Sequence, residues 1–317
     1  MLIIFSVFAA IVPMSIYLIL IWKFDHYDRE PFKLVLINYI WGAVGAIVLA
    51  VIGSLILTAI ASLFIKNDLQ LSRFGAIVVA PIIEEITKGL FLLITVTSKK
   101  FDNITDGIVY GGAIGLGFGM TENFLYFVTY SDSIPNWIAL VVIRSLFSGV
   151  MHCVSTATLG SFLGLAKFKS KDKKPLYIFA GLLIAMLIHS IWNSSVSYDN
   201  TAPIGFLFMI VSTIIFVSTY AVSIKGERKV IFNELKEESE KGIIPESHII
   251  ILSSSQREKK GWLDEKIRKT YIKAATTLAF RKVQLKNSNG ASKVYYEMDV
   301  DNYRIFIGKL LSNSNVA

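Results

Sequence analysis

The chain has 317 residues, of which 53% are hydrophobic and 18% are charged, and its mean hydropathy is +0.56. These values lie far from those of soluble globular domains, so they exclude that class and predict an integral membrane protein. The formal net charge is +8. Cys153 is the single cysteine, which excludes an intramolecular disulfide and a cysteine-based metal cluster, and we expect a small buried thiol there.

Apolar segments long enough to cross a bilayer follow one another along the first 224 residues. A spanning helix needs about 20 mostly apolar residues. We predict an all-α, polytopic bundle of about seven transmembrane helices over residues 1–22, 34–65, 74–97, 107–129, 137–166, 176–197 and 203–224. We interpret the first segment as a span and not as a signal peptide, because its start carries no Lys or Arg and no small-residue cleavage site precedes Trp22.

The Lys and Arg residues of the loops alternate between the two sides of this bundle. Cytoplasmic loops retain positive charge, so these residues indicate the orientation. The loops after the first, third and fifth spans carry Lys23, Arg29, Lys33, Lys99, Lys100, Lys167, Lys169, Lys171, Lys173 and Lys174. Those after the second, fourth and sixth spans carry only Lys66 and Arg73. We predict a multi-pass protein of the cell membrane, with the N-terminus outside and the C-terminal tail in the cytoplasm.

Residues 225–317 form a polar tail with 18 Lys and Arg against 12 Asp and Glu. We attribute this basic excess to attraction by anionic lipid headgroups. Nucleic-acid binding would call for a basic face with stacking aromatic residues, and we expect no nucleic-acid partner. The tail is predicted to be mainly helical and docked on the membrane or the bundle, with a helix over 262–286, a turn at 287–290 and a last helix near 300–311.

Seven ionisable side chains lie well inside the predicted spans: Glu84, Glu85, Lys88, Glu122, Arg144, His152 and His189. A charge at the bilayer centre costs about 2.5–3.5 kcal/mol even on insertion scales. All seven fall on the third to sixth spans, so we expect them to meet in one polar centre. A structural salt-bridge cluster is the alternative, but three Glu and two His exceed what one Lys and one Arg can neutralise.

Helical spacing predicts which of these side chains can pair. Lys88 lies four residues after Glu84 and three after Glu85, so its ammonium can reach either carboxylate and one glutamate is left for chemistry. A stripe of small residues, one at every fourth position, precedes Glu122: Gly107, Gly111, Gly115 and Gly119. Such a stripe lets membrane helices approach closely, which would bring Glu122 against a neighbouring helix.

The fifth and sixth spans add the two imidazoles. Arg144 and His152 lie on roughly one side of the fifth span, and His189 and Asn193 lie one turn apart on one face of the sixth. From a rise of about 1.5 Å per residue, the polar centre lies in the outer half of the membrane. A site there would receive its substrate from the extracytoplasmic side or laterally from lipid.

Such a set of side chains is suited to hydrolysis without a protein nucleophile. A carboxylate can act as general base on water, while imidazole and amide groups orient that water or stabilise an oxyanion. The same set could hold zinc through His152, His189 and one glutamate, with Glu122 as the candidate. Both readings stay open, so the cofactor is unknown; a glutamate-type mechanism requires none. The spans contain no HExxH, GxSxG or Gly-x-Gly-Asp motif of other intramembrane proteases.

Four motifs lie in order on consecutive spans: Glu84-Glu85-Ile86-Thr87-Lys88 (EExxK), Phe118-Gly119-Met120-Thr121-Glu122 (FxxxE), the segment from Arg144 to His152, and His189-Ser190-Ile191-Trp192-Asn193 (HxxxD/N). Together with Tyr27-Asp28-Arg29-Glu30-Pro31 they resemble the PrsW-type intramembrane proteases, within the superfamily of CAAX prenyl endopeptidases and bacteriocin-processing enzymes. The resemblance implies a bundle in which paired glutamates activate water and the histidines and Asn complete the site. The candidate catalytic residues are therefore Glu84, Glu85, Glu122, His152, His189 and Asn193, supported by Lys88, Arg144 and Phe118.

The resemblance also implies cleavage of a peptide bond in a membrane-protein substrate. One known role in the family is shedding the outer part of an anti-sigma factor, so a single-span anti-sigma-like protein is an expected partner, beside the lipid bilayer. The CAAX branch typically has EExxxR and FxxxH, which differ from this chain and disfavour a prenylated substrate. One rival class is a proton- or ion-coupled transporter, which would use the buried Glu and His residues as a relay. Transporters typically contain internal repeats, and we find none in this sequence, which disfavours that class. The other rival is a catalytically silent scaffold or receptor.

Overall fold

The computed structural model describes residues 2–98, 100–170, 172–198 and 200–314, and within them the regular structure is helical, without strands. Lys99 and Lys171, two of the loop cations counted above, lie outside the described residues. The chain divides into two compact units, of which the first comprises Met1–Asp25 and Glu30–Tyr220 and the second His26–Arg29 and Ala221–Ala317. Apart from the short loop His26–Arg29, this division falls near the predicted boundary after residue 224.

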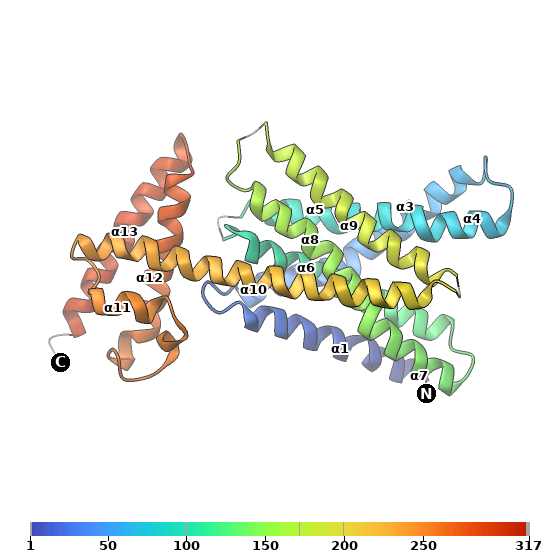
Figure 1. Ribbon diagram of the computed structural model, residues 1–317, viewed down its shortest axis with the longest axis horizontal. Helices are drawn as coiled ribbons and strands as arrows, with labels where there is room; N and C mark the ends of the chain where they lie inside the picture. Colours follow the sequence, from blue (N-terminus) through green and yellow to red (C-terminus); the bar gives the residue numbers. More distant parts are fainter. Residues whose placement is uncertain (1, 99, 171, 199, 315–317) are drawn as a thin grey trace. The chain divides into compact units, whose positions relative to one another are not determined.

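The first unit is a helical bundle in which three helices contain a π turn (Figure 1). In chain order its elements are α1 (Leu2–Phe24), α2 (Phe32–Ile40), η1 (Trp41–Ala46), α3 (Ile47–Ala61), α4 (Asp68–Phe74), η2 (Gly75–Val79), α5 (Ala80–Thr95), α6 (Ile104–Thr129), α7 (Ile134–Ile143), η3 (Arg144–Ser148), α8 (Gly149–Ala166), α9 (Lys174–Val196) and the first part of α10 (Ala202–Glu240). The π turns η1, η2 and η3 join α2 to α3, α4 to α5 and α7 to α8 into continuous helices.

Five helices in the described part of the chain are long and apolar enough to cross a membrane: Leu2–Phe24, Phe32–Ala61, Ile134–Ala166, Lys174–Val196 and Ala202–Glu240. They coincide with the predicted first, second, fifth, sixth and seventh spans. The predicted third and fourth spans are helical but are not among the five, and these are the segments that carry Glu84, Glu85, Lys88 and Glu122. The protein is thus a helical, polytopic membrane protein, and the count of seven spans stays a prediction.

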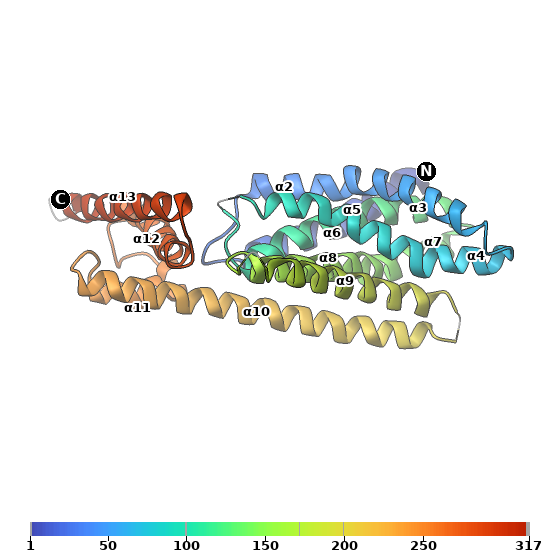
Figure 2. The ribbon, with the colours of Figure 1, turned by 90° about the horizontal axis from the view of Figure 1, so that it is seen from above.

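Helix α6 lies in the middle of the first unit, against α8 (Figure 1 and Figure 2). A Cβ atom on Gly107 or Gly115 would lie 2.0 Å from a backbone carbonyl oxygen of α8, and one on Gly111 would lie 2.5 Å from another. Any larger residue at these positions would force the two helices apart. The glycine stripe is therefore the surface on which α6 packs closely against α8, as its spacing predicts.

A capping box begins α6 at the edge of the predicted fourth span. The side chain of Asn103 accepts a hydrogen bond from the backbone N–H of Asp106 at 3.1 Å, and Asp106 accepts one from the backbone N–H of Asn103 at 3.2 Å. Each side chain satisfies a backbone donor that the helix leaves open. Asp106 therefore has a structural role at the start of the helix.

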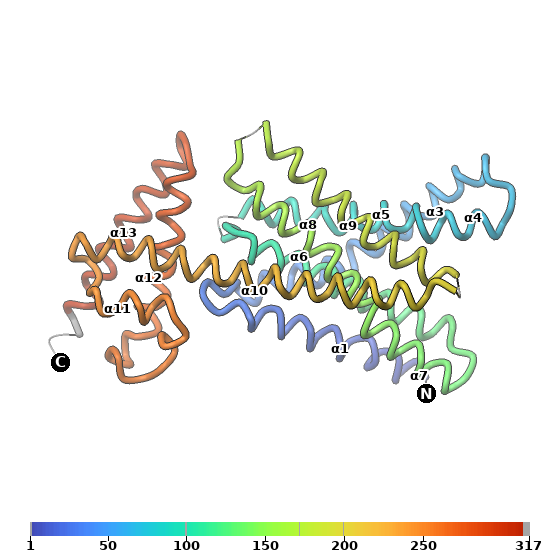
Figure 3. Tube along the Cα trace, in the orientation of Figure 1, coloured from blue at the N-terminus to red at the C-terminus, as the bar shows by residue number. Residues whose placement is uncertain are grey.

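The second unit contains the end of α10 followed by α11 (Glu246–Leu252), the 3₁₀ turn η4 (Ser255–Glu258), α12 (Glu265–Lys286) and α13 (Ala291–Ser314), a path that can be followed in Figure 3. Its apolar core includes Leu235, Tyr271, Leu278 and Ile307, all fully buried. The mainly helical character predicted for the tail is confirmed by these elements.

The predicted start of the last helix, near residue 300, is wrong. Helix α13 begins at Ala291, well before residue 300. Gly290 has a φ of 61°, a left-handed conformation that glycine adopts without strain, and it completes the predicted turn at 287–290. Because the chain enters helical geometry directly after this glycine, Val294, Tyr295 and Tyr296 belong to the helix.

Candidate active site

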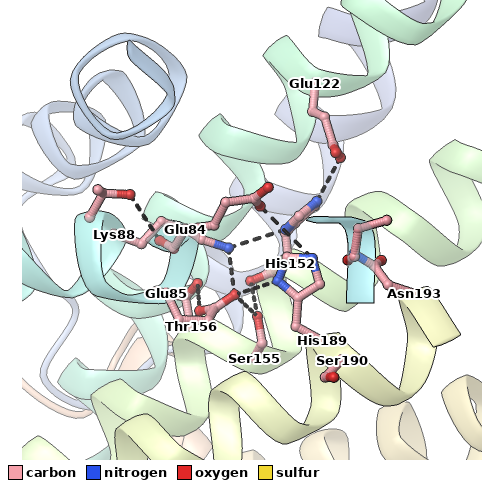
Figure 4. Close-up of polar contacts among 12 residues, drawn as sticks. Glu84, Glu85, Lys88, Glu122, His152, Ser155, Thr156, His189, Ser190 and Asn193 are labelled. Carbon is pink, nitrogen blue, oxygen red and sulfur yellow. Dashed lines mark hydrogen bonds and ion pairs between the residues drawn. The ribbon is translucent and has the colours of Figure 1, made fainter. Parts of the chain in front are cut away.

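The seven ionisable residues predicted inside the spans form one connected network of hydrogen bonds and ion pairs (Figure 4). Glu84, Glu85 and Lys88 come from α5, Glu122 from α6, His152 from α8 and His189 from α9, while Arg144 opens the π turn η3. The expectation that these side chains meet in one polar centre is confirmed. The close packing of α6 on α8 brings Glu122 to His152, as the glycine stripe indicates.

Glu85 is fully buried, and both of its carboxylate oxygens have partners. Its Oε1 accepts a hydrogen bond from the Lys88 ammonium at 2.6 Å and contacts Ser155 Oγ and His189 Nδ1, each at 3.0 Å. Its Oε2 accepts one from Thr156 Oγ1 at 3.2 Å. This set resolves the pairing that spacing leaves open, because Lys88 pairs with Glu85 at i,i+3 and not with Glu84.

Glu84 is the glutamate left over. Its side chain is 12% exposed, and its buried Oε2 has no hydrogen-bond partner in the described structure. His189 Nε2 lies 3.8 Å from that oxygen. This separation is too long for a direct hydrogen bond and short enough for one water molecule to contact both atoms.

His152 is held by polar contacts on both of its ring nitrogens. Its Nδ1 lies 3.2 Å from Lys88 Nζ and its Nε2 lies 2.7 Å from Glu122 Oε2. Because an ammonium group can only donate, the contacts assign the lone pair to Nδ1 and the proton to Nε2, which donates to Glu122. Arg144 Nη2 donates to the same oxygen of Glu122.

His189 shows the opposite tautomer. Its Nδ1 lies 3.0 Å from the Lys88-paired carboxylate of Glu85, so Nδ1 donates and Nε2 carries the lone pair. The two imidazole rings of His152 and His189 meet edge to face, with centroids 4.9 Å apart. The free lone pair of His189 thus faces the oxygen of Glu84 that has no partner.

Asn193 lies beside this network and makes no hydrogen bond to its carboxylates in the described structure (Figure 4). Its Nδ2 donates to the carbonyl oxygen of Ala76 at 2.9 Å, and Ser190 Oγ donates to that of Ile77 at 2.6 Å. Both carbonyls belong to η2, where the wider π turn leaves backbone oxygens open to other donors. In this structure Asn193 and Ser190 fasten α9 to the turn that precedes Glu84.

Phe118 forms an apolar wall of the network. Its ring centroid lies 4.5 Å from Lys88 Nζ and 5.1 Å from the centroid of the His152 ring. A cation over an aromatic face is attracted by the electron density of the ring. Phe118, the first residue of the FxxxE motif, therefore packs on Lys88, the partner of Glu85, and on His152, the partner of Glu122.

A cavity of about 620 Å³ lies beside the network and is lined by Glu84 and Glu122. The rest of its lining is mostly apolar and comes from α3, α4, η2, α5 and α6, including Val51, Leu55 and Leu71. It has the size and the character of a ligand site, with apolar walls and a few convergent polar groups. The carboxylate without a partner therefore faces a space that a substrate can enter.

One group of three side chains has the spacing of a metal site. Ligand atoms of Glu84, His152 and His189 all lie within 4.8 Å of one another. Two imidazoles and a carboxylate are the ligands of many catalytic zinc sites. The group contains Glu84 where the sequence offers Glu122 as the candidate. Glu122 is instead engaged by Arg144 and His152.

Sequence reasoning missed the hydroxyls that hold Glu85 and the residues that hold Arg144. Ser155 and Thr156 lie three and four residues after His152, on the same helical face, so their spacing was an available signal. Arg144 Nε donates to Asn123 Oδ1 at 3.0 Å, and its guanidinium lies 3.5 Å from the ring centroid of Tyr126. Asn123 directly follows Glu122, but nothing in the pattern distinguished it.

Comparison with known proteins finds one family and several curated relatives. The family described as PrsW family intramembrane metalloprotease matches residues 30–221, a range that includes every candidate site residue. A protein named Protease PrsW from Clostridioides difficile (strain 630) is 24% identical over 236 residues, covering 73% of this chain and 97% of its own. Proteins of the same name from Oceanobacillus iheyensis and Bacillus subtilis (strain 168) are 32% and 26% identical, covering 52% and 55% of this chain and 70% and 72% of their own. No solved structure matches significantly.

Proposed function

Because this chain belongs to the PrsW family of intramembrane metalloproteases, an enzyme class that acts on membrane proteins, we propose that Glu84 is the general base of its peptide-bond hydrolysis. The observation that carries the proposal is the buried Oε2 of Glu84, which has no hydrogen-bond partner among the described residues and belongs to a side chain that lines the cavity. Every other carboxylate of the network has a donor. Burying a polar oxygen without a hydrogen bond is costly, so an oxygen kept in this state is available to a substrate or a water molecule.

A water molecule contacting Glu84 Oε2 and His189 Nε2 would find two acceptors, one for each of its protons. Its own lone pair would then be free to attack a peptide carbonyl carbon, as Glu84 takes the proton. Glu85 has the complementary role of holding His189 in the tautomer that leaves Nε2 as an acceptor. In this proposal Glu84 is the catalytic residue and Glu85 is a positioning residue.

Stabilisation of the oxyanion is assigned to His152 and Asn193. His152 carries its proton on Nε2, and Glu122 keeps Arg144 as a partner when that proton is donated to substrate instead. Asn193 uses one amide proton on Ala76 and has a second for the oxyanion. Each such donor typically contributes about 10²- to 10³-fold to the rate of acyl transfer.

The family implies a metal ion, and the side chains present fit one. Glu84, His152 and His189 offer a carboxylate and two imidazoles within mutual reach, and the hydrogen bond from His189 Nδ1 to Glu85 is the outer contact that orients a histidine ligand. Zinc held by these three residues would supply a Lewis acid that polarises the peptide carbonyl. Both ring nitrogens of His152 are engaged in this structure, so binding zinc would require it to give up its contact with Lys88 or with Glu122. Glu84 and His152 would then act as metal ligands in place of the roles of base and oxyanion donor.

The character of the cavity supports an apolar, membrane-embedded segment as the part of the substrate that is cleaved. Its lining is mostly apolar, and Gly75, Ala76 and Ala80 leave room beside Glu84 for a polypeptide backbone. A single-span anti-sigma-like protein fits this description. We place the site in the outer half of the bilayer, with the N-terminus outside and the tail cytoplasmic, on the basis of the loop charges.

The decisive experiment compares Glu84→Gln with the wild type in lipid nanodiscs that contain a single-span substrate. We expect cleavage, followed by mass spectrometry, to fall by about 10²- to 10⁴-fold, the range of a lost general base. Asp68→Asn is the matched control, because Asp68 lines the same cavity but makes no contact with the network. Cleavage by Glu84→Gln at the wild-type rate would sink the assignment.

Metal content and orientation are tested on the same preparations. Stoichiometric zinc that is lost in both Glu84→Gln and His189→Gln would support the metal ligands named above. Zinc retained in both variants would contradict them.

The orientation in the membrane is tested with Ser133→Cys, in the loop between α6 and α7. The new cysteine should react with an impermeant maleimide added outside intact cells. Reaction only from the inside would contradict the proposed topology.

A further inference from the structure

We propose that the second unit contains a binding site for a phosphate-bearing anion. The site is a cavity of about 710 Å³ formed by the loop His26–Arg29, the 3₁₀ turn η4 and helix α12. This volume lies within the usual range for small-molecule sites. The inference is independent of the protease mechanism, because it concerns the polar unit and none of the residues of the intramembrane network.

Charged residues of the cavity favour an anion. The cationic side chains that line it are Arg29, Arg257, Lys269 and Lys273. The carboxylates that line it are Asp28 and Glu258, and His26 adds a titratable imidazole. Arg and Lys offer only hydrogen-bond donors, so the excess of cations is also an excess of donors. Arg in particular matches the geometry of phosphate oxygens.

Arg257 is the buried anchor of the site. Its side chain is only 6% exposed, and its two terminal nitrogens donate to the carbonyl oxygens of Leu252 at 3.4 Å and Tyr27 at 3.0 Å. Its buried Nε makes no hydrogen bond in the described structure, and Glu258 Oε1 lies 3.7 Å from it. Withdrawing a hydrogen-bond donor from water is costly when the donor has no acceptor, and the Nε–H of Arg257 has none in the described structure.

Thr276 provides a second buried donor without a partner. It is 2% exposed, and its hydroxyl makes no hydrogen bond in the described structure. A threonine within a helix commonly donates to the backbone carbonyl one turn before it. Thr276 does not, and it lines the same cavity as Arg257. Two residues with an unused buried donor therefore line the same cavity, which has ample room for a tetrahedral oxyanion.

The arrangement around Arg257 is rigid. Arg268 is buried on α12, and its Nη1 donates to the carbonyl oxygens of Arg257 and Glu258 at 3.0 and 3.1 Å. The indole of Trp262 donates to the carbonyl oxygen of Arg257 at 3.2 Å. These contacts hold η4 against α12, so the donors are positioned before a ligand arrives, which reduces the entropy cost of binding.

Trp262 offers a local signal for the test, since it contacts the backbone of Arg257. The purified full chain in detergent is titrated with inorganic phosphate at constant ionic strength, and the fluorescence of a Trp262→Phe variant is subtracted. We expect a saturable change. Lys269→Gln/Lys273→Gln removes two exposed cations of the cavity and should weaken binding about tenfold or more, the effect of losing a charge-assisted hydrogen bond.

Lys259→Gln/Lys260→Gln is the matched control, because it removes the same charge from exposed residues that do not line the cavity. It should bind phosphate as the wild type does. Thr276→Val tests the buried hydroxyl with little change of shape and should also weaken binding. An unsaturable response, or equal affinity in the two double variants, would overturn the proposal.

A second arm identifies the source of the phosphate group. The titration is repeated in nanodiscs of phosphatidylcholine and in nanodiscs that also contain phosphatidylglycerol. If an anionic lipid headgroup occupies the site, phosphatidylglycerol should suppress the response to added phosphate, and this suppression should be absent in Lys269→Gln/Lys273→Gln. An equal response in both lipids assigns the site to a soluble phosphate compound.

Discussion

Two clusters of charged residues in this protein have similar composition but differ in whether every carboxylate has a cationic partner. In the second unit, Glu234, Glu237 and Glu238 face Lys282, Lys286 and Arg304, and each glutamate contacts two or more cations. In the first unit, Glu85 and Glu122 are paired with Lys88 and Arg144, but Glu84 has no Lys or Arg at ion-pair distance in the described structure.

The difference separates a structural ion cluster from a candidate site. The cluster of the second unit satisfies its carboxylates, so its charges hold α10, α12 and α13 together. Glu84 and Glu122 both line a cavity, and of the three carboxylates in the network of the first unit only that of Glu84 has a buried oxygen without a hydrogen-bond partner in the described structure. Leaving a charge without a partner is more costly in a bilayer than in a polar tail, which is why the exception indicates function.

The largest effect on stability is expected from breaking the buried pair of the first unit. Lys88→Met leaves the Glu85 carboxylate without its cation and should lower the free energy of unfolding by about 3–5 kcal/mol. Glu85→Gln should have a similar effect, because it leaves the ammonium unpaired. The double variant removes both charges and should be more stable than either single variant, as measured by thermal unfolding in detergent. If the loss of stability in the double variant equals the sum of the losses in the two single variants, the coupling is contradicted.

A smaller loss is expected from widening the contact between α6 and α8. In Gly115→Ala the new Cβ would lie 2.0 Å from the carbonyl oxygen of His152, so the helices must separate, at about 1–3 kcal/mol. Because Glu122 and His152 lie across this contact, cleavage should fall with stability. Gly75→Ala is the control, since its nearest atom would be 3.7 Å away. Equal unfolding midpoints for the two variants would show that the close packing is unimportant.

The ion cluster of the second unit should respond to acid. Burial would raise the pKa of Glu238, but hydrogen bonds from Arg304 and Lys282 outweigh it and lower the pKa to about 2. The carboxylate therefore contributes stability above its unfolded pKa of about 4.3, and this contribution is lost as the pH falls from there towards 2.

Glu238→Gln should weaken the unit by about 1 kcal/mol at neutral pH and flatten this acid dependence, followed by Trp262 fluorescence in denaturant. The control is Glu240→Gln, an exposed residue on the same helix. An acid transition of the same steepness in Glu238→Gln would assign it to other carboxylates.

The smallest effect should come from the solvent-exposed edge of the same cluster. Asp301 is 61% exposed and pairs with Arg304 at 2.9 Å. Exposed pairs of this kind contribute about 0.2–1 kcal/mol, so Asp301→Asn should change stability by less than about 1 kcal/mol and lose its effect in high salt. A larger change would mean that Arg304 needs Asp301 to stay on Glu238.

The polar centre could be predicted from the sequence because a bilayer penalises each buried ionisable residue separately. Spacing along α5 could not choose between Glu84 and Glu85, since Lys88 lies within reach of both. The choice is made by Ser155, Thr156 and His189, which come from α8 and α9 and form hydrogen bonds with Glu85. Such a choice depends on how three helices pack, and no local pattern contains it.

Other differences have a similar origin. The resemblance assigns Asn193 to the site, but the sequence does not show that one of its amide protons is used by a carbonyl of η2. The π turns η1, η2 and η3 have no compositional signal in apolar segments, so the sequence predicts the continuous helices there but not the π turns within them. The start of α13 depended on one glycine with a positive φ, which marks a turn in the sequence without giving its length.

The π turn η2 has a consequence for how this site can change by mutation. A π turn holds one more residue than the α-helical turn it replaces, so deleting any one residue between 75 and 79 would restore a regular helix. Such a deletion would rotate Glu84 by about 100° relative to α4. It would also remove the open carbonyls that Ser190 and Asn193 bind. The segment between Arg73 and Pro81 should therefore tolerate many substitutions but no insertion or deletion.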